Sequence, residues 1–187
     1  QHGLRQHSDG AGAYVPVQTR SERFASTDVA DFDEVTGREA VWKLSPVDSF
    51  RDLLATSLDG SPTPITVESA PGTTVEWIPR DDARIGRAGT PEERASAAAW
   101  SNTEQALLIT VDGESDSNTT VSRHGFGDVP RAAHVVVEAR PQSVGTVILD
   151  HSGQARLTEN VEIVVGAGAS LTVVTVQDWD DTAVHLS

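Results

Sequence analysis

The chain of 187 residues contains no cysteine and no methionine. Without cysteine, these residues form no disulfide, supply no thiolate nucleophile and offer no thiolate to zinc or iron. Such a composition is compatible with the cytoplasm, which is the location that we expect. Because methionine is missing, the sequence does not begin at an initiator residue. We therefore expect that processing or trimming has removed the start of the native chain, and that the chain continues beyond Ser187, which follows a strand-like segment with no polar cap.

Basic residues are scarce as well: 14 Lys and Arg stand against 28 Asp and Glu, a formal net charge of −14. Both halves of the chain are acidic. A protein that binds a nucleic-acid backbone needs a stripe of Lys and Arg to displace counterions, so nucleic acid is not an expected partner. Attraction to an anionic membrane surface is disfavoured for the same reason. No apolar run approaches the roughly 20 residues of a membrane span, and no signal-peptide core is visible.

Residues 1–60 are predicted to form an N-terminal arm and a small helical region. Residues 1–20 show no hydrophobic period and are rich in Gly, Gln and Ser, which favours a flexible or loosely packed arm. Thr36 and Glu39 have the spacing of a capping box, so a helical turn is expected to begin there.

A second helix is expected to follow at once. Ser45, Pro46 and Asp48 fit its N-cap, N1 and N3 positions. Trp42 is expected to pack beneath these helices. The apolar residues that would share one face of the second helix are Val47, Phe50, Leu53 and Leu54.

Residues 61–187 are predicted to form a β core. "ITVESAPGTTVEWIP" contains two short strand candidates around a Pro-Gly turn. One inserted helix is expected near 91–101, with Thr90 as N-cap, Pro91 at N1 and Glu93 at N3. After Asn102 nearly every segment resembles a strand: "ALLITVDG", "TTVSRH", "AHVVVEA", "GTVILDH", "VEIVVG" and "SLTVVTVQDW".

These strand candidates contain a weak repeat at an offset of 27 residues. The offset superposes Val137 on Val164, Val144 on Leu171, Val147 on Val174, Leu149 on Val176 and Pro141 on Gly168. A period of this length without intervening helices suits a β-solenoid as well as a series of hairpins. Nearly continuous apolar runs favour strands that are covered on both faces or that form a solenoid rung. Gly166–Ser170, "GAGAS", then form a tight corner between two rungs.

Motifs that could bind or catalyse are weak. "GAGAS" lacks the Gly-Lys-Ser/Thr ending of a phosphate-binding loop, and no helix follows it. "DWDD" at 178–181 offers three carboxylates but neither the ligand number nor the glycine turn of a calcium site. Four histidines fall among the strands without metal-site spacing, and the 27-residue offset predicts no histidine pair. They are His124, His134, His151 and His185.

Paired carboxylates for sugar hydrolysis could come from four acids, which the sequence alone does not place. They are Glu138, Asp150, Glu159 and Glu162. Ser170 lacks the context of a catalytic serine. Asn118-Thr119-Thr120 matches a glycosylation sequon, which matters only in a secreted protein. We therefore assign no catalytic, cofactor-binding or metal residue, and we expect no enzyme activity.

Two blocks of the sequence resemble the SufD family of iron–sulfur cluster assembly scaffolds. "TGREAVWKLSPV" is similar to an N-terminal family signature, and "LDHSGQARLTENVEIVVG" with "ENVEIVVGAGASLTVVTVQDW" is similar to the β-helix core. The similarity extends from about Ser21 to Ser187. The sister scaffold SufB shares the β-helix, but the first block is more similar to SufD.

The resemblance implies a right-handed parallel β-helix, a single-stranded β-solenoid, preceded by the helical region and apparently truncated at its C-terminal end. It implies a scaffold that pairs with SufB and with the ATPase SufC. A cluster would be held only transiently in the complex, and by none of these residues. The open β-helix edge could also support a homodimer. The alternatives are a carbohydrate-active β-helix enzyme and a purely structural β-solenoid.

Overall fold

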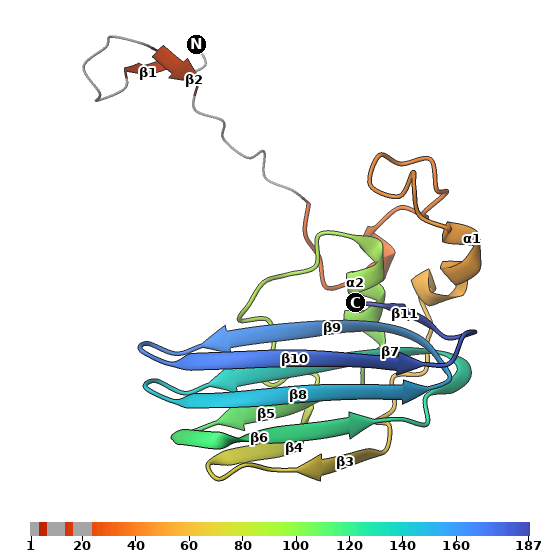
Figure 1. Ribbon diagram of the computed structural model, residues 1–187. Helices are drawn as coiled ribbons and strands as arrows, with labels where there is room; N and C mark the ends of the chain where they lie inside the picture. Colours follow the sequence, from red (N-terminus) through yellow and green to blue (C-terminus); the bar gives the residue numbers. More distant parts are fainter. Residues whose placement is uncertain (1–3, 7–13, 17–23) are drawn as a thin grey trace.

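The structure is a computed structural model that describes residues 4–6, 14–16 and 24–187. Strands β1 (Leu4–Gln6) and β2 (Tyr14–Pro16) form a small antiparallel pair (Figure 1). The flexible arm expected over residues 1–20 otherwise lies outside the described residues. The helical region and the strands that follow form the body of the molecule.

Two sheets stacked on one another make up this body (Figure 1). The first has the order β10-β8-β6-β3 and contains β3 (Ile65–Glu68), β6 (Glu114–Arg123), β8 (Val144–Gly153) and β10 (Ser170–Trp179). The second has the order β11-β9-β7-β5-β4 and contains β4 (Thr73–Pro79), β5 (Gln105–Val111), β7 (Gly127–Ala139), β9 (Ala155–Val165) and β11 (Val184–Leu186).

From β5 onward, successive strands alternate between the two sheets, so the chain coils into a β-solenoid of about three turns. Strands β5 to β11 pair in parallel with the strands one turn away. Only the first two strands of the solenoid differ, because β3 and β4 run antiparallel to β6 and β5. The solenoid that the sequence predicts is confirmed, and the hairpin alternative is wrong.

The predicted spacing of 27 residues between paired positions is wrong by one residue. Val147 pairs with Val173, 26 positions on, and Val121 pairs with Leu149, 28 positions on. The spacing changes where the register shifts, between Gly127 and Arg131 in β7 and near the start of β6. Such bulges add residues to one strand without adding a pair, so no single period describes the coil. An error of one position matters because neighbouring residues face opposite sides of a sheet.

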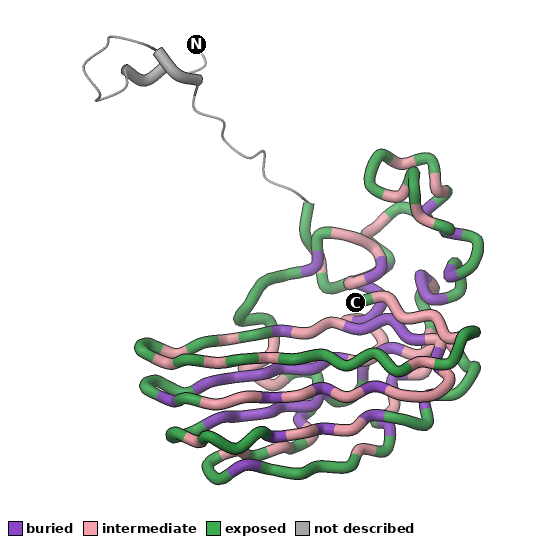
Figure 2. The backbone as a smooth tube through the Cα atoms, in the orientation of Figure 1, coloured by how far each residue is buried: buried purple, intermediate pink, exposed green. Residues whose placement is uncertain are grey.

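The hydrophobic core lies between the two sheets, where Figure 2 shows buried chain on adjacent strands. Its members are all aliphatic and at most 3% exposed: Leu107, Ile109, Val111, Val121, Val135, Val137, Ala139, Val147 and Leu149. Helix α2 (Arg94–Asn102) and the segment before it cover the outer face of the second sheet. Strand β7 is therefore buried on both faces, which explains the continuous apolar run in "AHVVVEA".

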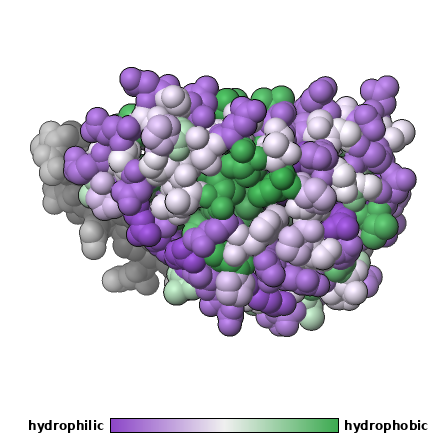
Figure 3. All heavy atoms as spheres, turned by 90° about the horizontal axis from the view of Figure 1, so that it is seen from below, coloured by the Kyte–Doolittle hydropathy of each residue, from purple (hydrophilic) through white to green (hydrophobic). Residues whose placement is uncertain are grey.

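Apolar atoms also gather at the lower end of the solenoid (Figure 3), on the side of β3 and β4. Ile65, Val75 and Trp77 of these strands pack against the core without being fully buried, and Val67 is 36% exposed. The core is therefore only partly covered at this end.

The helical region contains η1 (Val29–Asp31), α1 (Val47–Phe50) and η2 (Arg51–Leu54). The expected apolar face is confirmed, because Val47, Phe50, Leu53 and Leu54 form one buried cluster. Trp42 packs on it, with ring centroids 5.9 Å from those of Phe50.

Two expected helix starts in this region are wrong. Pro46, not Ser45, occupies the N-cap position of α1 and makes no side-chain cap. Thr36 and Glu39 begin turns rather than a helix. The Thr36 hydroxyl and backbone N–H both donate to the Glu39 carboxylate. In a capping box, the hydroxyl would instead accept the backbone N–H of Glu39.

The start of α2 is corrected as well. The N-cap is Glu93, whose carboxylate accepts the backbone N–H groups of Ala95 and Ser96, so the helix begins at Arg94. Thr90 and Pro91 belong to the preceding loop. An acidic side chain at this position satisfies free N–H groups and also complements the helix dipole.

Candidate functional site: a buried charged cluster inside the solenoid

Polar side chains replace the aliphatic core at one end of the solenoid. Arg123 ends β6, and it pairs laterally with His151 of β8, which pairs with Gln177 of β10. Arg123 and His151 continue the inward-facing rows that contain Val121 and Leu149, and Gln177 is the exposed member at the edge of the cluster. Glu159 of β9 and His185 of β11 meet them from the opposite sheet.

A buried ion pair forms the centre of this cluster. Arg123 Nη1 lies 2.6 Å from Glu159 Oε2, and both side chains are 1% exposed. The same guanidinium nitrogen lies 2.8 Å from His151 Nε2. Because arginine only donates, His151 Nε2 accepts this bond, and its Nδ1–H faces the Val176 carbonyl oxygen at 3.2 Å. These bonds are those of the neutral Nδ1–H tautomer of His151, whose Nε2 also lies 3.4 Å from Glu159 Oε1.

His185 completes the cluster from the other side. Its Nε2 lies 3.0 Å from Glu159 Oε1, and its Nδ1 lies 3.1 Å from Gln177 Oε1. The indole N–H of Trp179 donates to the same Gln177 oxygen at 2.5 Å. The rings of His151 and His185 pack against each other with centroids 5.5 Å apart.

The electrostatics of the cluster favour a permanent negative charge on Glu159. Burial acts to raise the pKa of this carboxyl, but the charge of Arg123 and the side-chain contacts with His151 and His185 outweigh it and hold the pKa well below its usual range. Arg123 Nε is buried and has no hydrogen-bond partner. Within the described residues, no group of three or more His, Cys, Asp or Glu side chains is arranged to hold a metal ion. The cluster of Arg123, His151, Glu159 and His185 is therefore an arrangement of side chains that can carry charge and bind protons.

A second polar pair lies on the outer face of the second sheet. His134 Nε2 is 2.7 Å from Glu162 Oε1, and the Glu162 carboxylate also accepts the backbone N–H groups of Gly86 and Ala88. The Trp100 ring meets His134 edge-on. Burial acts to raise the pKa of Glu162, but these hydrogen bonds lower it overall. The pair fastens the loop before α2 to the sheet.

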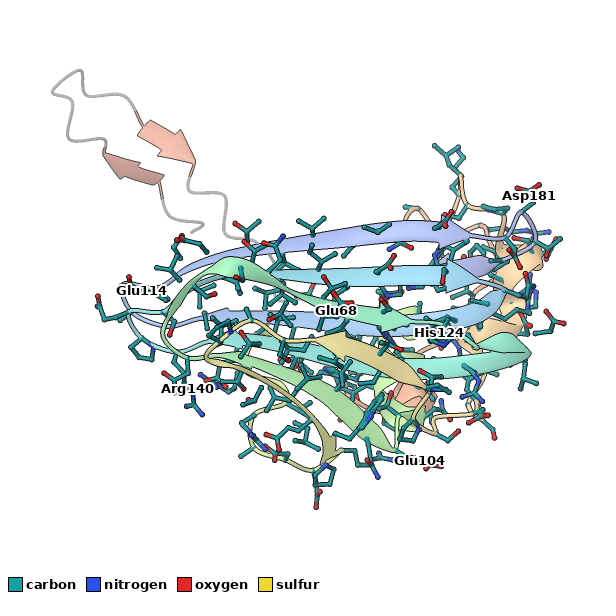
Figure 4. The ribbon with its side chains drawn as sticks, turned by 60° about the horizontal axis from the view of Figure 1, so that its bottom comes forward. Glu68, Glu104, Glu114, His124, Arg140 and Asp181 are labelled. Carbon is teal, nitrogen blue, oxygen red and sulfur yellow. The ribbon has the colours of Figure 1, made fainter. Side chains whose placement is uncertain are left out.

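The histidine expectations have mixed outcomes. The expectation that no two histidines meet is wrong, because His151 and His185 are in contact. A 27-residue offset would pair His151 with Asp178, whereas the structure pairs it with Gln177. His124 follows β6 and is exposed (Figure 4).

The four acids proposed for sugar hydrolysis do not converge on a cleft. Glu159 and Glu162 occupy opposite faces of β9. Glu138 is on the outer face of β7 and pairs with Arg87 at 2.9 Å, while Asp150 is on the outer face of the other sheet beside Ser122.

The remaining motifs fall in turns and on the surface. Gly166–Ser170 contain the corner between β9 and β10, as expected. Gly166 lies so close to the neighbouring turn that a Cβ atom would be 2.6 Å from Pro141 N. The acids of "DWDD" are exposed, with Asp181 in the turn beyond β10 (Figure 4). Asn118 and Ser170 are exposed positions of β6 and β10.

Sequence reasoning missed Arg123, Gln177 and Trp179. The sequence did contain a signal for Arg123, because this residue follows Thr119 and Val121 at the alternate positions that face inward in β6. A charged residue in such a row needs a buried partner.

Comparisons with known proteins point to one family. Residues 122–187 match the family model of the SufBD core domain of the SUF system for FeS cluster assembly. An iron-sulfur cluster assembly SufBD family protein of Mycobacterium tuberculosis is 36% identical over 177 residues, which cover 91% of this chain and 44% of the relative. A SufBD family protein of Mycobacterium leprae is 31% identical over 180 residues, covering 94% of this chain and 46% of that protein. Over most of its length the chain is therefore similar to SufBD family proteins, and its residues 122–187 match the SufBD core domain.

All members of the charged cluster lie within the SufBD core match. The chain spans less than half of the length of the curated relatives that it matches. No solved structure matches it. Among the described residues, no helix has the length and apolarity that crossing a membrane requires.

Proposed function

We propose that the chain is part of a SufD-like scaffold subunit that supports iron–sulfur cluster biogenesis. The observation that carries the proposal is the SufBD core match on residues 122–187, which includes the parallel strands β7 to β11. Membership of this family implies a role in FeS cluster assembly. The assignment to SufD rather than SufB rests on the N-terminal block "TGREAVWKLSPV".

The proposed subunit acts without catalysing a reaction of its own. It pairs with a SufB-like scaffold and a SufC-like ABC ATPase in the cytoplasm, and a nascent cluster passes through the complex transiently. The absence of cysteine from this sequence is consistent with such a role, because thiolate ligands for a cluster would come from a partner or from residues outside this sequence. A homodimer through the open edge of the solenoid is a secondary proposal, supported by the unpaired outer edges of β10 and β11.

The sugar-cleaving alternative has less support. Its acid and base need two carboxylates about 5–10 Å apart across a cleft. The candidate acids instead lie on different faces and are engaged by Arg87, Arg123 and the loop before α2.

Co-purification tests the proposal. The chain and the full-length native protein serve as parallel baits in source lysate, and bound proteins are identified by mass spectrometry. We expect the full-length bait to capture a cysteine-bearing SufBD homologue and an ABC ATPase. If the folded full-length bait captures neither, the scaffold proposal fails, and turnover of acidic polysaccharides becomes the next assay.

A further inference from the structure

Strand β11 presents two different faces to the rest of the molecule. Val184 and Leu186 pack against the apolar cluster of the helical region, which includes Phe50 and Trp42. His185 lies between them in sequence and faces the opposite way, toward the charged interior of the solenoid. This three-residue strand therefore connects the helical region to the buried cluster.

Both ring nitrogens of His185 face an acceptor oxygen. The Glu159 carboxylate only accepts, so His185 Nε2 donates to it. The orientation of the Gln177 amide is fixed by Trp179, because an indole N–H only donates and its partner is Gln177 Oε1. The Gln177 oxygen therefore also faces His185 Nδ1, and only an imidazolium donates to both partners.

The charges around His185 are consistent with one additional proton. Glu159 is the only carboxylate among the side chains that bond to His185 in the described structure, and it is shared with Arg123. His151 is neutral, because its Nε2 accepts from Arg123. The cluster thus avoids two adjacent imidazolium rings.

One further carboxylate borders the same space. Glu93 of α2 lines a cavity of about 350 Å³ together with His185 and Glu159. The Glu93 carboxylate is engaged in capping α2.

We propose that His185 is a proton-dependent clasp that seats β11, and with it the helical region, on the solenoid. In the imidazolium form, His185 bonds to Glu159 of β9 and to Gln177 of β10. When the Nδ1 proton is lost, Nε2–H still donates to Glu159. The unprotonated Nδ1 then faces Gln177 Oε1 with a lone pair, so this hydrogen bond is lost. The seat of β11 is therefore firm while His185 carries both ring protons and loosens when one of them is lost.

Hydrogen exchange measured by NMR on the full chain tests this proposal. Protection factors of the β11 amides, which correct for the intrinsic pH dependence of exchange, are compared at pH 5.5 and pH 8.5. We expect about tenfold higher protection at pH 5.5. Ring ¹⁵N shifts at pH 5.5 should show both nitrogens of His185 protonated and His151 Nε2 unprotonated.

Three variants separate the clasp from a merely structural contact. Gln177→Met removes the bond that needs the proton and leaves Glu159, so the pH dependence of β11 protection should disappear. His185→Gln should abolish it as well. His124→Gln, at an exposed position outside the cluster, should leave it unchanged.

Two results would overturn the proposal. One is equal β11 protection at both pH values in the unmodified chain. The other is a His185 ring with a single proton at pH 5.5. Neither depends on whether the variants fold.

Discussion

Arg123 Nη1 and Glu159 Oε2 lie 2.6 Å apart in the interior of the solenoid, each on a side chain that is 1% exposed. Removing one partner leaves the other charge buried. We expect Glu159→Gln to lower the free energy of unfolding by about 3–5 kcal/mol, measured by urea denaturation. The double variant Arg123→Met, Glu159→Leu should lose much less, because neither charge of this ion pair is left without its partner. A loss below about 1 kcal/mol in the single variant would contradict this account of the cluster.

Gly60 lies against the end of α2. A Cβ atom at this position would be 1.7 Å from the carbonyl oxygen of Asn102, which is backbone and has little freedom to move. Gly60→Ala should therefore cost about 1–3 kcal/mol of unfolding free energy. Gly89→Ala is the matched control, because nothing lies within 4 Å of its Cβ position, and it should change stability by less than about 0.5 kcal/mol. Equal effects of the two variants would refute the close contact.

Glu162 should make the loop before α2 sensitive to acid. Because folding lowers the pKa of Glu162 below its ordinary value of 4.5, the carboxylate stabilises the fold above that value. This contribution is lost as the pH falls from about 4.5 through the lower pKa of the folded state. Protection of the Gly86 and Ala88 amides against hydrogen exchange should fall over this range. In Glu162→Gln, the loss of Gly86 and Ala88 protection at acidic pH should be absent. If the protection still falls in this variant, another group is responsible for the acid sensitivity.

Arg156 holds the helical region to β9 through Asp52. Its guanidinium makes two hydrogen bonds to the Asp52 carboxylate and one to the Ser49 carbonyl oxygen. The hydrogen bond from Arg156 lowers the pKa of Asp52 below its ordinary value of 3.8. In Arg156→Gln, an NMR titration should show the Asp52 pKa rising toward that value. Arg38→Gln should leave it unchanged, and a similar rise in both variants would indicate a general charge effect.

Much of the fold could be predicted because its signals are local. Strand β10 has the bounds expected from "SLTVVTVQDW", and the corner at Gly166 follows from residues with small side chains. The solenoid itself followed from short connections between apolar strands. Helix starts were less predictable, because Glu93 and Thr90 both offer a capping oxygen and only the fold of the loop decides between them.

The candidate site could not be predicted because it depends on register. His151 and Gln177 meet only at the 26-residue spacing, and His185 reaches Glu159 from a strand whose spacing to β9 is different again. Bulges and corners set these offsets, and their lengths are not encoded in any single repeat. Arg123 alone carried a local signal, as a charge in an inward-facing row.

The most direct test of the central claim measures iron–sulfur enzyme activity in cells of the source organism that are depleted of this protein. The scaffold account predicts that the activity of a [4Fe–4S] enzyme such as aconitase falls at unchanged enzyme abundance, and that the native gene restores it. Unchanged activity of several iron–sulfur enzymes after complete depletion, in cells without another cluster assembly system, would contradict the account.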